Sequence, residues 1–197
     1  MLIAILFVVQ LLTAAVGNTF VQKFIDGDAN RTALTFGALL MMFSGIIIAA
    51  IGILLYGVLR VTKSALAIWV PVIRITECTV ALIFGVYLLT TLQTVTDHLL
   101  WVYVLAGAAG VILCYVLFTS TLIPRPIVTL GGLGYASLLL GVPLDFAGVI
   151  DMNAGFGQVL FVPGGVFEVL VLPVWLVARG FTSPEPRSSK IPVGSLA

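Results

Sequence analysis

Charged residues are scarce in this 197-residue chain, at 9% of the sequence, and there is a single histidine. Soluble domains typically carry about 25% charged and 45–50% apolar residues, whereas here the apolar share is 61% and the mean hydropathy is +1.24. This shortage of charge excludes an ordinary soluble fold and leaves no stretch for a separate soluble domain. No basic patch interleaved with aromatic residues occurs, so nucleic acid is not expected as a partner.

Residues that catalyse reactions or hold cofactors are also few. Cys78 and Cys114 fall inside apolar runs at different predicted depths, so we expect two buried thiols and no disulfide. His98 has Asp97 beside it but no further ligand cluster, and the glycines between 131 and 134 lie in an apolar run instead of following a strand. We therefore expect no cofactor, no metal site and no catalytic residue, which favours a non-enzyme and leaves an enzyme as the less favoured alternative.

Long apolar runs are abundant and predict an all-α, polytopic membrane protein with six transmembrane helices. A span needs about 20 apolar residues. The first run lacks a basic segment before it and is long for a signal peptide, so we expect it to be retained as the first helix. The runs lie roughly at 2–20, 33–59, 64–91, 99–119, 126–145 and 157–179. Residues 1–181 then form one six-helix bundle, and the Pro- and Ser-containing tail 182–197 is expected to be disordered.

Basic residues between the runs predict the orientation, because short cytoplasmic loops of membrane proteins are enriched in Lys and Arg. With both termini in the cytoplasm, most of the basic residues lie on the inner side. The inner residues are Arg60, Lys63, Arg125, Arg179, Arg187 and Lys190, and the outer ones are Lys23 and Arg31. We therefore predict that both termini, including the tail, are cytoplasmic.

Three charged residues lie inside the apolar runs. Arg74 and Glu77 are in the third run and Glu168 is in the sixth. At about 1.5 Å per residue, all three fall near the centre of a ~30 Å hydrocarbon core. Three isolated charges there would cost on the order of 8–10 kcal/mol, so we predict that they form one buried cluster. Two neighbouring carboxylates in a low-dielectric site do not both ionise cheaply, so one of them is expected to hold a proton.

Helix-breaking residues stand beside these charges. They are Pro71, Pro163, Gly164, Gly165 and Pro173. Pro71 precedes Arg74 by three positions and is expected to interrupt the third helix, because it removes a backbone hydrogen bond. Interrupted helices with charges at the bilayer midplane indicate a transporter-like site. Ordinary kinked helices explain the same residues, since Gly and Pro are common in membrane spans.

A short motif occurs twice. The pattern R-x-x-x-T-[FL]-G opens the second run at Arg31–Gly37 and the fifth run at Arg125–Gly131. Each of these runs precedes one that carries a glutamate, and three-helix halves would have opposite orientations, as inverted repeats require. An inverted repeat and a chance match both explain the pattern.

Several segments from Leu54 onward follow one another in the order found in a known family. They are LLYGVLR at 54–60 with SALA at 64–67, RITE at 74–77, YVLFTSTLIPR at 115–125, FEVL at 167–170 and WLVARG at 175–180. In these segments the chain resembles the bacterial membrane family of domain of unknown function 4386 (DUF4386). The resemblance implies a multi-pass protein of the bacterial inner membrane and brings no activity with it.

Three classes of function fit these patterns. A small carrier or proton-linked transporter would use the Arg/Glu/Glu cluster, and it predicts a hydrated cavity that reaches Glu77 or Glu168. A structural, sensor or accessory subunit would instead keep a dry, static network of ion pairs. A lipid-acting enzyme comes third, and a lipid-facing groove at Asp145, Asp151 or His98 would favour it. The partners expected are the lipid bilayer and a small molecule or a proton.

Overall fold

The structure is a computed structural model that describes residues 2–28, 30–62, 64–93, 98–152 and 155–180. Its long helices are α1 (Leu2–Ile25), α2 (Arg31–Leu59), α3 (Trp69–Thr91), α4 (His98–Ser120) and α5 (Arg125–Phe146). Short elements are η1 (Arg60–Thr62), η2 (Ala65–Ile68), η3 (Gly155–Phe161), α6 (Val162–Val166), η4 (Phe167–Val171) and α7 (Leu172–Ala178). The described part of the chain contains no strand, so the all-α prediction is confirmed there.

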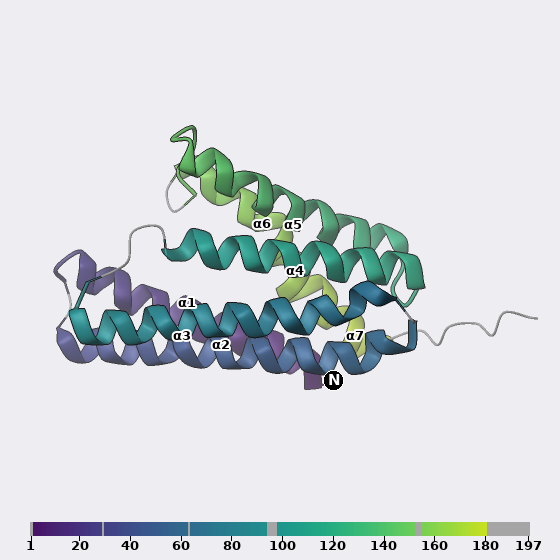
Figure 1. Cartoon of the computed structure of the whole chain (residues 1–197), viewed down its shortest axis with the longest axis horizontal. Coiled ribbons are helices and arrows are strands. Elements are labelled where there is room, and N and C mark those ends of the chain that lie inside the picture. Colours follow the sequence, from purple (N-terminus) through teal and green to yellow (C-terminus); the bar gives the residue numbers. More distant parts are fainter. Residues whose placement is uncertain (1, 29, 63, 94–97, 153–154, 181–197) are drawn as a thin grey trace, which may run out of the picture.

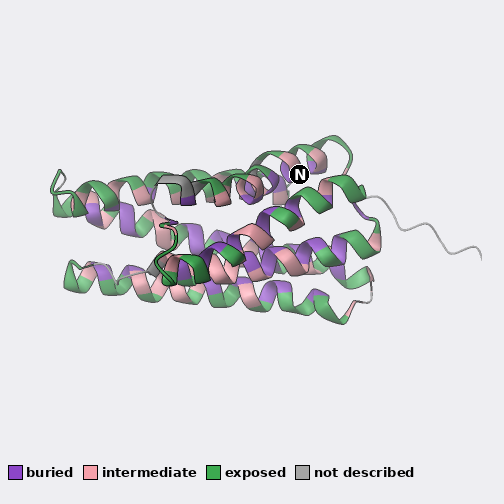
Figure 2. Ribbon diagram, turned by 90° about the horizontal axis from the view of Figure 1, so that it is seen from above, coloured by how far each residue is buried: buried purple, intermediate pink, exposed green. Residues whose placement is uncertain are grey.

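Five helical segments among the described residues are long and apolar enough to cross a membrane. They are Leu2–Ile25, Arg31–Thr62, Ala65–Thr91, Leu99–Ser120 and Arg125–Phe146. Their outer faces are exposed along the whole bundle (Figure 2) and carry large apolar side chains such as Ile83, Leu133 and Leu140. Apolar outer faces of this length are what a lipid-facing surface requires. These features identify a multi-pass membrane protein.

The sixth predicted helix is helical from Gly155 to Ala178 but changes type along its length. Pro163 and Pro173 stand in the first turns of α6 and α7, where a missing N–H costs least. Between them, the N–H of Leu172 bonds to the carbonyl of Phe167 five residues earlier, which makes η4 a wide π turn. Because this segment is divided, it is not among the five long spans, and the count of six spans stays a prediction.

Two helix starts differ from those expected from sequence. Helix α2 begins at Arg31, because the side-chain oxygen of Asn30 accepts the N–H of Ala33 and caps the helix. Pro71 does not interrupt the third helix in its middle. It lies in the first turn of α3, where backbone N–H groups have no partner within the α-helix. Proline is tolerated at that position, and the segment changes from the 3-10 helix η2 to the α-helix α3 two residues before Pro71.

The helices form a ring in the order of the sequence. Each long helix packs against the next, and η4 and α7 return to pack against α1. In Figure 1, α1, α2 and α3 form one layer and α4, α5 and α6 form the other. The contact between α3 and α4 joins the layers on one side, and the contact between α1 and α7 joins them on the other. The interior of this ring is therefore lined by all parts of the chain.

One half of the ring is tightly packed with apolar side chains. The largest buried cluster comes from the first turns of α1, α3 and α5 and the last turns of α2, α4 and α7. Phe7, Leu55 and Leu117 are typical members, and each is at most 1% exposed. This half adjoins the turns at 60–64 and 121–124. It seals one end of the ring, which we call the packed end.

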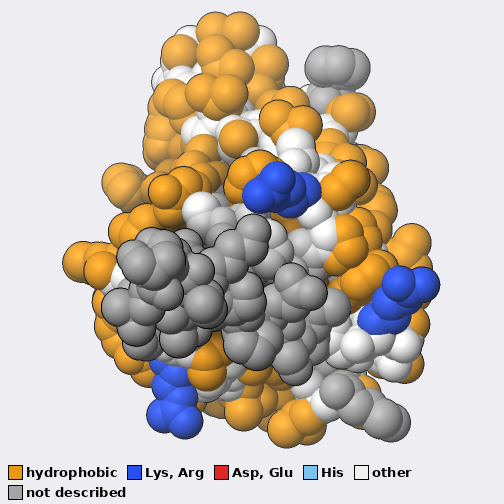
Figure 3. Space-filling model, turned by 90° about the vertical axis from the view of Figure 1, so that its right-hand side faces the viewer, with side chains coloured by type: hydrophobic (Ala, Val, Ile, Leu, Met, Phe, Trp, Pro, Cys, Tyr) orange, Lys and Arg blue, Asp and Glu red, His pale blue; other side chains and the backbone are white. Residues whose placement is uncertain are grey.

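The two ends of the bundle differ in charge. Described basic residues at the packed end are Arg60, Arg125 and Arg179. Figure 3 views this end and shows Lys and Arg but no Asp or Glu among the described side chains in sight. The opposite end carries Lys23, Arg31, Asp26, Asp28, Asp145 and Asp151. This asymmetry is the basis for predicting a cytoplasmic packed end, and the predicted tail 182–197 lies outside the described residues.

Glycine at position 134 permits the close approach of α5 and α6. A Cβ atom there would lie 2.6 Å from the carbonyl carbon of Pro163 and closer still to the backbone nitrogen of Gly164. We expect Gly134→Ala to lower the free energy of unfolding by roughly 1–3 kcal/mol, because backbone atoms cannot turn aside as a side chain can. Thermal unfolding in detergent micelles measures this change.

The matched control is Gly57→Ala on α2, because a Cβ at Gly57 would meet no atom within 4 Å. Alanine favours helix over glycine by about 1 kcal/mol, so this variant should unfold at or above the wild-type temperature. Equal stability of the Gly134 variant and the wild type would show that the two helices are not in such close contact.

Candidate functional site

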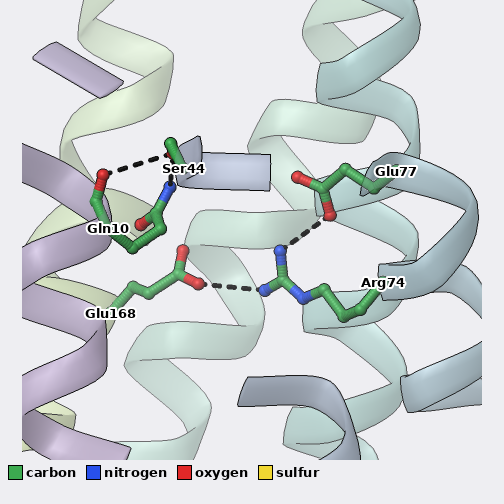
Figure 4. Close-up of polar contacts among 5 residues, drawn as sticks. All are labelled: Gln10, Ser44, Arg74, Glu77 and Glu168. Atoms are coloured by element: carbon green, nitrogen blue, oxygen red, sulfur yellow. Dashed lines mark hydrogen bonds and ion pairs between the residues drawn. The ribbon is translucent and has the colours of Figure 1, made fainter. Parts of the chain in front are cut away.

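Arg74 lies inside the ring between two carboxylates. Its Nη1 donates to Oε2 of Glu77 and its Nη2 donates to Oε1 of Glu168, both at 2.9 Å (Figure 4). Arg74 and Glu77 are three residues apart on α3, and Glu168 comes from η4. A guanidinium presents its donors as a rigid fork, so it can serve two carboxylates at once. The structure therefore brings the three intramembrane charges together in one cluster.

A glycine on α2 makes room for the arginine. A Cβ atom at Gly52 would lie 2.8 Å from Cβ of Arg74 and 3.1 Å from its Cγ. The aliphatic part of Arg74 therefore lies directly against the α2 backbone. Sequence reasoning missed Gly52, and the available signal was a glycine at the same predicted depth as the buried charges.

The three charged side chains differ in how far they are enclosed. The side chain of Arg74 is 2% exposed and that of Glu77 is 5% exposed, whereas Glu168 is 16% exposed. Arg74 and Glu77 thus form a sealed ion pair in the ring interior. Glu168 is the member of the cluster that water or a ligand can reach.

A partly open cavity of about 430 Å³ begins at this cluster. It is lined by α1 to α5 and by the segment that contains α6 and η4, and it runs from Glu168 past Gln10 and Ser44 towards Asn18 and Leu99. Its direction is away from the packed end. Apart from the cluster, its polar lining residues are Gln10, Asn18, Ser44, Tyr103 and Tyr135, and the remainder are apolar residues or glycine. The cavity therefore ends blindly at the charged cluster, halfway along the bundle.

Two polar residues on α1 and α2 lie beside the cluster. The side-chain nitrogen of Gln10 donates to Oγ of Ser44 at 3.2 Å, and that hydroxyl donates to the backbone carbonyl of Gln10 at 3.3 Å. Figure 4 shows this pair next to Glu168. Sequence reasoning missed both residues, although a glutamine within the first apolar run was a usable signal.

Tyr135 is a further residue that sequence reasoning missed. Its side chain is almost wholly buried, at 2% exposure, and lines the cavity. The hydroxyl lies beside the carboxylate of Glu168. Its ring packs edge-on against Phe167 with 6.2 Å between centroids. Tyr135 therefore adds a buried hydroxyl group to the closed end of the cavity, next to Glu168.

The predicted helix breakers divide between the two halves of the site. Pro163 and Pro173 flank the π turn that carries Glu168. Gly164 and Gly165 line the cavity, and a Cβ at Gly165 would meet no atom within 4 Å. Four of the five helix breakers therefore lie in the segment that carries Glu168. The fifth, Pro71, lies in the first turn of α3, the helix that carries Arg74.

The other residues considered from sequence do not join this site. Cys78 and Cys114 are both free thiols. The carboxylate of Asp145 accepts the N–H of Met152, which stabilises the loop after α5. Within the described ranges, no group of three or more His, Cys, Asp or Glu could hold a metal ion. Asp97 and the side chain of His98 lie outside the described part of the structure.

Removing the shared cation should be far more costly than removing an exposed one. We expect Arg74→Met to lower the free energy of unfolding by about 3–5 kcal/mol, because two buried carboxylates would lose their partner. The loss should shrink as the pH falls, since protonation of the carboxylates removes their charge. Thermal unfolding of the purified protein across a pH series measures both effects.

The control for this prediction is Arg60→Met at the packed end, where the arginine is exposed. Surface substitutions of this kind usually change stability by at most about 0.5 kcal/mol. A loss of stability as large in Arg60→Met as in Arg74→Met would contradict a special role for the buried arginine.

One comparison with known proteins gives a match. Residues 84–180 match the model of the family described as domain of unknown function (DUF4386). The matched region runs from α3 to the end of α7, so it contains Glu168 and leaves Arg74 and Glu77 before it. None of the curated proteins and none of the solved structures matches the chain. The match confirms the resemblance found in the sequence over residues 84–180, which carry a DUF4386 domain.

Proposed function

We propose that the protein is a small membrane carrier that binds and releases a proton at Glu168. One observation carries this proposal: a cavity leads to the Arg74–Glu168 pair, and Glu168 is the member of the cluster that is partly exposed. A static network would need no such access. Charged groups at bilayer depth are costly, so an accessible one is expected to have a role.

The charges of the cluster support proton exchange. Arg74 carries one positive charge and faces two carboxylates at 2.9 Å each. With both carboxylates ionised the cluster has a net charge of −1, and with Glu168 protonated it is neutral. Glu77 is enclosed with Arg74, whereas Glu168 is the carboxylate that water in the cavity can reach, so we assign the exchanged proton to Glu168. A proton-linked carrier requires a carboxylate that can take up and release a proton.

The arrangement of the helices supports alternating access. The packed end closes the cavity on one side, so transport requires that end to open while the other end closes. The two three-helix layers run in opposite directions, and the second and fifth helices begin at opposite ends with the repeated motif. These features support an inverted repeat.

The proposed setting is the bacterial inner membrane with both termini in the cytoplasm. The packed end, with its basic residues, would then face the cytoplasm, as short basic loops do. The cavity would face the outside. This is the state in which a carrier loads an external solute or proton.

The second candidate function is a sensor or accessory subunit with a fixed ion-pair network. The enclosure of Arg74 and Glu77 favours it, because both side chains are almost wholly buried and bonded to each other. In that case Glu168 would stay ionised at all working pH values. A lipid-acting enzyme is not supported by Asp145, because its carboxylate accepts the backbone N–H of Met152 and so stabilises the loop after α5.

Proton binding at Glu168 is the test that separates the two candidates. We expect infrared difference spectra of the reconstituted protein to show a carboxylic acid carbonyl band that appears as the pH falls. Glu168→Gln should abolish that band, because an amide binds no proton there. The matched control is Glu185→Gln on the tail, which should leave the band unchanged. An identical band in both variants would eliminate Glu168 as the proton site.

Access of water to the cavity gives a second test. In a chain with Cys78→Ser and Cys114→Ala, we expect Ala14→Cys to react with a charged, water-soluble maleimide, because Ala14 lines the cavity. The reactive species is the thiolate, which forms in water and not in hydrocarbon. Leu12→Cys is the control, since Leu12 lies nearby on α1 with its side chain on the apolar outer face at 56% exposure.

Labelling is measured by the mass shift of protein in intact membranes. Equal labelling at positions 12 and 14 would mean that α1 is not oriented in the bilayer as proposed. Absence of labelling at position 14 in protein that is correctly inserted would indicate a dry cavity and support the static network.

A further inference from the structure

We propose that the substrate of this carrier is an apolar organic molecule with one positive charge, which takes the place of the proton at Glu168. This inference rests on the proposed function and adds the chemical class of the substrate to it. The charge, the lining and the size of the cavity all favour such a molecule.

The charge of the cluster favours a cation and disfavours an anion. Both terminal nitrogens of Arg74 already donate to carboxylates, one to Glu77 and one to Glu168. An acidic substrate would therefore find no uncommitted cation among the described residues that line the cavity, and it would face two carboxylates. A single positive charge beside Glu168 would instead bring the cluster from −1 to neutrality, as a proton does.

The lining limits the rest of the substrate to apolar groups. Beyond the cluster, five of the cavity's side chains are polar, and Gln10 and Ser44 already bond to each other. A sugar or another heavily hydroxylated molecule would leave most of its groups without hydrogen bonds, which costs free energy. Apolar groups need no hydrogen bonds, and their transfer from water to contact with residues such as Leu138 and Phe161 is favourable in free energy.

Aromatic rings line both ends of the path. Tyr103 packs edge-on against Phe161 with 4.5 Å between ring centroids, and Tyr135 lies near Glu168 at the closed end. Aromatic faces attract organic cations, and they do so more strongly away from water. The volume of about 430 Å³ lies within the range of about 300–1,000 Å³ that holds drug-sized ligands.

Exchange at Glu168 balances in charge and in atoms. The protonated acid loses its proton to water in the cavity as the cation arrives, and the resulting carboxylate pairs with the cation. The cluster stays neutral throughout, because one positive charge leaves as the other enters. No bond other than the O–H bond of Glu168 is broken. One proton should therefore be released for each cation bound when Glu168 starts protonated.

Tetraphenylphosphonium is a suitable probe, since it is apolar, carries one permanent positive charge and cannot itself exchange protons. We expect the purified full-length protein to bind it in titration calorimetry, with release of about one proton per site wherever Glu168 is protonated before binding. Proton release is obtained by repeating the titration in buffers of different ionisation enthalpy. Tetraphenylborate has the same four phenyl groups and a negative charge, and it should not compete.

Three variants connect this binding to the cavity. Glu168→Gln should weaken binding by roughly 10- to 100-fold, which corresponds to losing one charge-assisted contact. Glu168→Asp keeps the charge and should retain most of the affinity. Gly165→Val places two methyl groups in open cavity space, so it should weaken binding while leaving the proton band of Glu168 in place. Glu185→Gln on the tail should bind as the wild type does.

The outcomes separate this inference from the proposed function. A titrating Glu168 together with no binding of tetraphenylphosphonium, or with equal binding of tetraphenylborate, would overturn the substrate class and leave proton exchange intact. Cation binding that survives both Glu168→Gln and Gly165→Val would place the probe elsewhere and overturn the inference. Failure of Glu168 to titrate would overturn the proposed function itself. If Glu168→Gln does not fold, the aspartate and valine variants still decide the result.

Discussion

The structure depends on one guanidinium held between two carboxylates in the interior of an apolar bundle. Arg74 joins α3 to η4 through Glu168, so the two three-helix layers are connected by an ion pair at mid-depth. Each partner lowers the cost of enclosing the others, and removal of one would leave the rest buried and unpaired. The glycine at position 52 is part of this arrangement, because the arginine stem occupies the space where a side chain on α2 would be.

The ring has an uneven interior, and this unevenness gives the site its form. Between the cluster and the packed end, apolar side chains fill the interior. Between the cluster and the other end, small residues such as Ala14 and Gly165 leave space. The same six segments line both halves. The charged layer is therefore the floor of a cavity instead of part of a continuous core.

Much of the fold follows from the sequence, because apolar runs of span length have few alternatives to a membrane helix. The depth of Arg74, Glu77 and Glu168 followed from residue counting, since a helix rises by a fixed amount per residue. The cavity could not be predicted, because it depends on which faces of the helices meet. Tyr135 and Gly52 owe their importance to contacts with neighbours distant in sequence. The π turn at η4 also depends on tertiary packing, although Pro163 and Pro173 marked the segment as irregular.

The blind cavity has an electrical consequence. Water conducts ions and hydrocarbon does not, so in an energised membrane a water-filled cavity carries little of the voltage, and most of the potential falls across the packed apolar half. A full membrane potential of 100 mV is worth about 2.3 kcal/mol for each elementary charge. A cation that reaches Glu168 from the cavity would cross little of that field, whereas its passage beyond Phe167 and Leu172 would cross nearly all of it.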